Sequence, residues 1–412
     1  MKVIPLAPTA LRVGAKVPFA LRDGSGALLL AAGGLIESEL MRKQLVERGL
    51  FVDILDSENF QRALAGKVDS MVRNNDALRT LANVRVEAAE LVAEGHNTGL
   101  PGAMAPVRKV LDPLTAWQNL ALRAGGLLHE PSPQDYVGRL ALLDQDIVSL
   151  LRADPDSALL LMMQNATSEV HQYSVNHALL VCIVCELAAS ELTGWPTELH
   201  KPLRCAALTM NIAMTSLQDE LARQTIPMSQ RQRGRVHSHA QDGAEQLATL
   251  GVEDALWIEA VAHHHTAPFG PLEGLATGLR LARLIQRADI FAARLSPRRL
   301  RPAMSATSAA RATYLDENQA PDEAGAAILK ALGIYPPGCY VQLASGELGV
   351  VLKRGARANE PRVASVISRS GTPLGDPIIR DTRLKAHEIK GGVAPKDVRV
   401  RVPVAKLLSM VN

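Results

Sequence analysis

Histidine is concentrated in two short runs in the middle of the chain, and histidine is a common protein ligand of transition metals. The runs are His263-His264-His265 and His237-Ser238-His239, and Asp289 follows at the edge of the apolar face of a predicted helix. Imidazole nitrogens and a carboxylate together suit a divalent transition-metal ion. Each feature also has a simpler explanation, because a histidine run in a loop is often only solvated and a helix-edge aspartate is often paired with an arginine. The sequence therefore predicts a metal site only if the fold brings these segments together.

The elements that must position these residues are mainly helices. From residue 136 to about residue 331 one apolar helical pattern follows another. The first 56 residues instead predict a small β-rich unit with strands at 17–22 and 27–31 and one helix. After residue 333, short β-branched runs predict strands at 340–343, 348–352, 363–367 and 398–404. The predicted fold class is mainly α, with a β-rich segment at each end. The predicted domains are a β-rich domain (1–56), a helical linker region (57–135), a helical domain (136–333) and a β-rich C-terminal segment (334–412).

The composition excludes several classes of partner. The chain of 412 residues is 47% hydrophobic and 21% charged, as in folded globular proteins. It has only five Phe, five Tyr and three Trp, which argues against stacking surfaces for single-stranded nucleic acid. The net charge of +3 gives no strong electrostatic signal for binding of duplex DNA. We therefore expect no DNA partner.

A cytoplasmic location without a membrane partner is also predicted. Pro5 and Pro8 interrupt the N-terminal segment, so no signal peptide is recognised. The densest apolar run, 178–189, is too short to span a bilayer and contains a glutamate. Cys182 and Cys185 form a CxxC pair within this helical apolar stretch, where buried core thiols are expected rather than a zinc or redox site.

Residues 169–304 resemble an HD-GYP domain, a metal-dependent phosphodiesterase family that hydrolyses cyclic di-GMP. The resemblance implies an HD-type helical bundle between the two β-rich segments, and a metal site that draws on Glu169, His239, His264, His265 and Asp289. Landmarks of the family occur in the same order here: Glu169, Tyr173-Ser174-Val175-Asn176, the segment 206–214, His239-Ala240-Gln241-Asp242-Gly243, His264-His265 and Arg287-Ala288-Asp289.

Several positions depart from the family pattern. Met210-Asn211 stands where the family has its His-Asp pair, Met214 replaces its lysine, and Tyr173 replaces the histidine of the first helix. A neutral asparagine is a poor bridging ligand, and a thioether does not hold a hard divalent ion. The Gly-Tyr-Pro loop is absent as well, because the segment after His265 is shorter than the family loop and begins with Thr266 instead of a glutamate. The sequence is therefore identified as a degenerate relative.

The surviving ligands imply a site for a single ion. In the family the three histidines belong largely to one metal position, whereas the lost groups served the other. The resemblance therefore implies one divalent transition-metal ion, iron or manganese, or no ion at all. Two-metal hydrolysis needs a hydroxide clamped between ions about 3.5–4 Å apart, which this sequence does not provide. His177 lies one turn beyond Tyr173, about 5.4 Å along the helix, so it could replace the lost ligand only if the site were remodelled.

The basic loop after Asp289 supplies a candidate phosphate-binding group. Arg298, Arg299 and Arg301 lie where the family carries an arginine-containing loop, and guanidinium groups suit phosphate. The simpler interpretation is a solvated basic loop.

Three functions remain open from the sequence. The first is a degenerate cyclic di-GMP signalling protein that acts by binding a cyclic dinucleotide or protein partners of a signalling pathway, with hydrolysis lost or weak. The second is an active single-ion phosphodiesterase or phosphohydrolase, and the third is an interaction module with structural histidines. A homodimer is a further expectation.

Overall fold

The computed structural model describes residues 3–6, 11–24, 28–53, 56, 113–168 and 172–411. The chain divides into two compact units, Met1–Gly126 and Leu127–Asn412, and the boundary residue Gly126 lies within the long helix α5 (Pro113–His129). Most of the predicted helical linker, together with Glu169, lies outside the described residues.

The first unit contains a small antiparallel sheet and one described helix before residue 57, as the sequence predicts. Its strand order is β1-β4-β2-β3. Helix α1 begins after Ser38, whose hydroxyl accepts a hydrogen bond from the Met41 amide, and it buries Met41 and Leu45. The elements are β1 (Val3–Pro5), β2 (Leu21–Arg22), β3 (Leu28–Leu30), α1 (Glu39–Glu47) and β4 (Phe51–Asp53).

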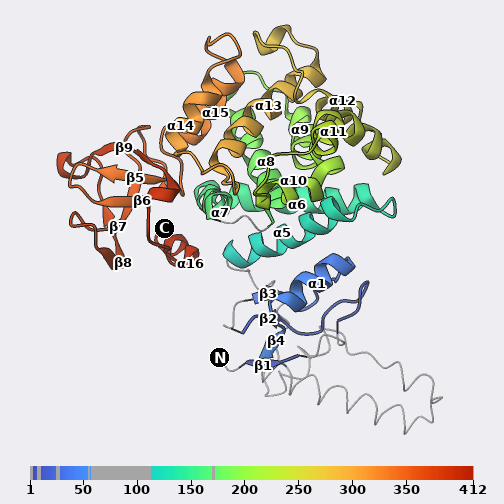
Figure 1. Ribbon diagram of the computed structural model, residues 1–412, viewed down its shortest axis with the longest axis horizontal. Coiled ribbons are helices and arrows are strands. Elements are labelled where there is room, and N and C mark those ends of the chain that lie inside the picture. Colours follow the sequence, from blue (N-terminus) through green and yellow to red (C-terminus); the bar gives the residue numbers. More distant parts are fainter. Residues whose placement is uncertain are drawn as a thin grey trace, which may run out of the picture. The chain divides into compact units, whose positions relative to one another are not determined.

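Between residues 127 and 333 the second unit is a block of helices, which confirms the mainly α fold class (Figure 1). Helix α8 is buried on nearly all sides because α7, α9, α10, α13 and α15 pack around it. The helices are α6 (Tyr136–Ala153), α7 (Pro155–Ser168), α8 (Tyr173–Glu191), α9 (His200–Thr209), α10 (Thr215–Arg223), α11 (Gln230–Thr249), α12 (Ala255–His263), α13 (Thr277–Leu295), α14 (Ala306–Tyr314), α15 (Glu323–Leu332) and α16 (Val404–Leu408).

Helix α8 is longer than the apolar run expected from the sequence. Its length and composition would allow it to cross a membrane, but 83% of its apolar window is buried inside the fold. Cys182 and Cys185 lie on this helix, fully buried and unbridged, which confirms them as core thiols.

The C-terminal segment forms an antiparallel five-stranded sheet in the order β8-β7-β6-β5-β9. Its core is continuous with the helical block, because Leu160 of α7 and Leu407 of α16 pack against its buried valines. Gly338 has a positive φ of 89°, and a β-carbon there would lie 2.7 Å from the Leu160 carbonyl, so a larger residue would collide with α7. The strands are β5 (Tyr340–Leu343), β6 (Leu348–Lys353), β7 (Arg362–Ile367), β8 (Pro373–Arg380) and β9 (Ile389–Val393).

The predicted strand at 398–404 is wrong. Residues 398–403 form no strand, and α16 begins at Val404, directly after Pro403. The apolar residues of this segment pack against the core of the sheet without joining its hydrogen-bond ladder. Proline has no backbone N–H to donate to such a ladder. Strands β8 and β9 were not predicted, because the β8 residues are mostly exposed or half-buried and β9 contains two glycines.

Candidate functional site

Three histidines from two helical segments converge in the second unit. His239 lies on α11, whereas His264 and His265 follow the end of α12. The Nε2 atom of His239 lies 3.2 Å from Nε2 of His264 and 3.2 Å from Nε2 of His265. One ring nitrogen from each residue can be chosen so that all three lie within 4.8 Å of one another. Within the described part of the chain, this is a group of side chains with the geometry to hold one ion.

Backbone hydrogen bonds orient two of these rings for metal binding. Nδ1 of His239 donates to the Val236 carbonyl at 2.7 Å, and Nδ1 of His264 donates to the Val261 carbonyl at 2.7 Å. When Nδ1 carries the proton, the lone pair of a neutral imidazole lies on Nε2. Two such lone pairs then face each other at 3.2 Å with no proton between them. A cation between the rings would relieve this arrangement, so the donor set fits a divalent ion.

Burial keeps the same two imidazoles neutral. His239 and His264 are 1% and 0% exposed, whereas His265 is exposed. Burial, assisted by the neighbouring His265, lowers the pKa of His264 to about 3, although the hydrogen bond to the Val261 carbonyl and the nearby Asp289 oppose the shift. Burial also lowers the pKa of His239. A histidine must be neutral to bind a metal, so these rings are in the ligating state at neutral pH.

Asp289 lies beside the three histidines but is paired with another residue. Its Oδ1 atom lies 2.7 Å from Nε2 of His177, which comes from α8. Burial alone would raise the pKa of Asp289, but the hydrogen bond from His177 and the nearby His265 and His264 outweigh burial and lower it. The partner of this helix-edge aspartate is therefore a histidine and not an arginine. Asp289 is not a member of the compact three-histidine group.

The residues at the positions that depart from the family pattern include no imidazole, carboxylate or thiol. Met210 is fully buried at the end of α9, and Met214 is half-buried in the short 3-10 helix Ile212–Met214. The two methionines therefore do not lie on one continuous α-helix. Asn211 is 9% exposed, and its Oδ1 has no hydrogen-bond partner among the described residues. Tyr173 stacks on His177 with ring centroids 5.8 Å apart and an interplanar angle of 8°.

Of the three arginines in the basic loop, Arg298 contacts a residue of the site. Its guanidinium carbon lies 5.4 Å from the centre of the Tyr173 ring, and its Nε donates to the Tyr173 hydroxyl at 3.3 Å. Arg299 and Arg301 are exposed, and the Arg301 guanidinium donates to the Ala293 carbonyl. The solvated interpretation therefore fits Arg299 better than Arg298.

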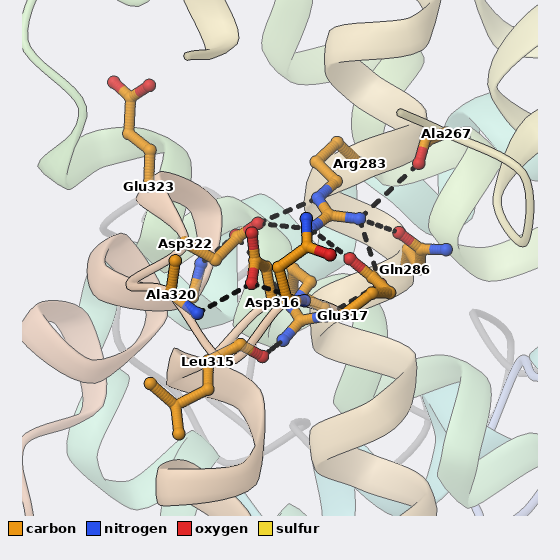
Figure 2. A network of polar contacts seen from close by, with 12 residues as sticks. Ala267, Arg283, Gln286, Leu315, Asp316, Glu317, Ala320, Asp322 and Glu323 are labelled. Atoms are coloured by element: carbon orange, nitrogen blue, oxygen red, sulfur yellow. Dashed lines mark hydrogen bonds and ion pairs between the residues drawn. The ribbon is translucent and has the colours of Figure 1, made fainter. Parts of the chain in front are cut away.

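A polar network that was not predicted from the sequence centres on Arg283 (Figure 2). Its residue Gln286 fixes the backbone next to His265. Gln286 of α13 donates to the His265 carbonyl at 3.0 Å and accepts from Nη1 of Arg283 at 2.6 Å. Arg283 is 1% exposed and also donates to Asp322 and Glu317. An arginine on an amphipathic helix usually indicates a solvated face, so the sequence carried no signal for this buried network.

Comparison with known proteins gives two matches. No family model matches the chain. The chain is 29% identical over 246 residues to the cyclic di-GMP phosphodiesterase PA4108 of Pseudomonas aeruginosa, and the match spans 58% of each protein. A solved structure of Bd1817, an HDG"Y"P protein from Bdellovibrio bacteriovorus, covers 80% of this chain and 99% of its own at 13% identity and a TM-score of 0.38.

The PA4108 match and the ordered landmarks within residues 169–304 lead to the same assignment. The structure adds that three of the landmark histidines converge on one point. This chain is a relative of the HD-GYP domain family.

Proposed function

We propose that this chain is a cyclic di-GMP signalling protein whose HD-GYP-like site binds the dinucleotide, with hydrolysis lost or weak. One observation carries the proposal: the residues that converge can hold one ion, whereas Met210 and Asn211 supply nothing for a second. Met210 points into the apolar core, and Asn211 carries no charge. Two-metal hydrolysis holds the attacking hydroxide between two ions. A site with one ion can attract phosphate but cannot hold the hydroxide in this way, so binding is favoured over turnover.

His239, His264 and His265 would hold the ion, with Asp289 beside them. A divalent ion in this position, which we propose to be iron or manganese, would supply Lewis-acid attraction for a phosphodiester oxygen. The chain itself contributes Arg298, whose guanidinium is held against the Tyr173 ring and can donate to phosphate oxygens. These groups together suit a phosphodiester anion.

A single-ion phosphodiesterase is the second candidate. Two of the ligand imidazoles are neutral and the carboxyl of Asp289 is ionised, as metal-assisted hydrolysis requires. The PA4108 match also favours it, because that relative is a phosphodiesterase. Cytoplasmic location, protein partners and a homodimer stay predictions.

The test combines calorimetric binding of cyclic di-GMP with a hydrolysis assay on the full chain loaded with manganese or ferrous iron. We expect binding without appreciable turnover, loss of metal in His264→Ala, and weaker binding in Arg298→Ala. Arg299→Ala is the matched control, because Arg299 belongs to the same loop but is exposed. Sustained turnover that disappears in His264→Ala would establish the single-ion enzyme instead. Absence of both binding and turnover would refute both candidates.

A further inference from the structure

His177 is the buried histidine that none of the family landmarks includes. It lies on α8 one turn after Tyr173 and is 1% exposed. Its Nδ1 is buried without a hydrogen-bond partner among the described residues, whereas its Nε2 lies 2.7 Å from Oδ1 of Asp289. A proton on Nδ1 would have no acceptor, but a proton on Nε2 meets a carboxylate. The neutral ring is therefore an Nε2–H donor to Asp289.

The ring of His177 is also held in orientation. Tyr173 stacks nearly parallel to the His177 ring, and Nε of Arg298 donates to the Tyr173 hydroxyl. Tyr173 stands where the HD-GYP family has the histidine of its first helix. The ring of this tyrosine stacks against the ring of His177.

This contact leaves one oxygen of Asp289 for other partners. Oδ1 accepts from His177, and no second hydrogen bond to this carboxylate is found in the described part of the chain. Gln286, one turn before Asp289 on α13, donates to the His265 carbonyl at 3.0 Å, so this face of α13 lies against the three-histidine group. A carboxylate with one oxygen engaged can offer its other oxygen to a single ion, but it is poorly suited to bridge two.

We propose that His177 is a positioning residue that fixes Asp289 as a ligand of one ion and prevents it from bridging a second. The inference rests on the single-ion site of the proposed function. It assigns to this chain a histidine that supports the metal from outside the ligand set, through its hydrogen bond to Asp289. Outer hydrogen bonds of this kind set the orientation of ligands, and their loss typically weakens metal binding by about 10–100-fold.

The experiment titrates the metal-free full chain with Co²⁺ and follows the visible absorption bands, which report on the number and geometry of ligands. His177→Phe retains a flat ring against Tyr173 but loses the N–H donor. We expect wild type to bind one equivalent of Co²⁺ and His177→Phe to bind it about 10–100-fold more weakly with an altered spectrum. His177→Gln, whose amide can donate to Asp289, should recover much of the affinity. Thermal unfolding of each metal-free variant controls for folding.

A double-mutant cycle separates positioning from a merely structural role. If His177 acts through Asp289, then His177→Phe should cause no further loss of Co²⁺ affinity in an Asp289→Asn background. The inference would be overturned if His177→Phe bound Co²⁺ as tightly as wild type or more tightly. It would also be overturned if wild type bound two equivalents of Co²⁺ or none. No nucleotide is used, so failure of the chain to bind cyclic di-GMP would refute the proposed function alone.

Discussion

Replacing Asp322 by asparagine should destabilise the helical unit far more than replacing Glu317 by glutamine, although Arg283 binds both. Nε of Arg283 donates to Asp322 Oδ2 at 2.9 Å, and Nη2 donates to Glu317 Oε2 at 2.9 Å. The two side chains differ in exposure, which is 2% for Asp322 and 48% for Glu317. Figure 2 shows both carboxylates next to the same guanidinium.

The expected magnitudes follow from this difference in exposure. Removing one partner of a buried ion pair leaves the other charge unpaired and costs about 3–5 kcal/mol. An exposed ion pair is screened by water and contributes about 0–1 kcal/mol. Asp322 also accepts from the Gly325 amide at the start of α15, but asparagine keeps that capping oxygen. The loss in Asp322→Asn therefore measures the buried charge and not the helix cap.

The assay is urea denaturation followed by far-ultraviolet circular dichroism, with the change in free energy of unfolding taken from the midpoint and slope. We expect a loss of about 3–5 kcal/mol for Asp322→Asn and less than about 1 kcal/mol for Glu317→Gln. Equal losses in the two variants would show that burial does not determine the strength of these contacts. Such a result would refute the reasoning applied to the network that holds His265.

Two further outcomes follow from other buried groups. Burial alone would raise the pKa of Glu186, but hydrogen bonds from His200 and Arg204, both at 2.9 Å, lower it below 4.5. Glu186 therefore stabilises the fold above its ordinary pKa, and this contribution is lost as the pH falls through the lower value in the fold. Between about pH 6 and pH 3, the melting temperature should thus fall less in Glu186→Gln than in wild type. Parallel curves of melting temperature against pH for the two proteins would contradict a stabilising role of the ionised Glu186. At pH 8 the native protein should resist a thiol reagent that labels the denatured chain fully. The four cysteines are buried, and burial raises the pKa of Cys205 to about 12. Rapid labelling of a CxxC thiol in the native protein would contradict this expectation.

Local sequence patterns predicted much of the fold. Long apolar periodicities gave the helical block, and three of the four predicted C-terminal strands correspond to β5, β6 and β7. Strand β8 was missed because it lies at the edge of the sheet and is largely exposed, so it carries little apolar alternation. The segment 398–404 was misassigned because apolar β-branched residues also pack against a sheet without pairing with it.

The sequence also predicted part of the candidate site. The types and order of the histidines were readable, and the Nδ1 contacts of His239 and His264 are local, each with a carbonyl three residues earlier. The other contacts of the candidate site join residues that lie far apart in the sequence. His177 and Asp289 are 112 residues apart, and Arg298 and Tyr173 are 125 residues apart. From the sequence, His177 is only a candidate replacement ligand, whereas the structure pairs it with Asp289.

The sequence by itself determined the chemical inventory: imidazoles and a carboxylate in family order, and the loss of charge at Met210-Asn211. Only the tertiary structure decided which side chains meet. Helix packing brings α11 and the end of α12 together and places α8 against α13, so that three ring nitrogens converge and His177 reaches Asp289. Side-chain pairing across helices depends on the packing of the whole core, and no local periodicity encodes it.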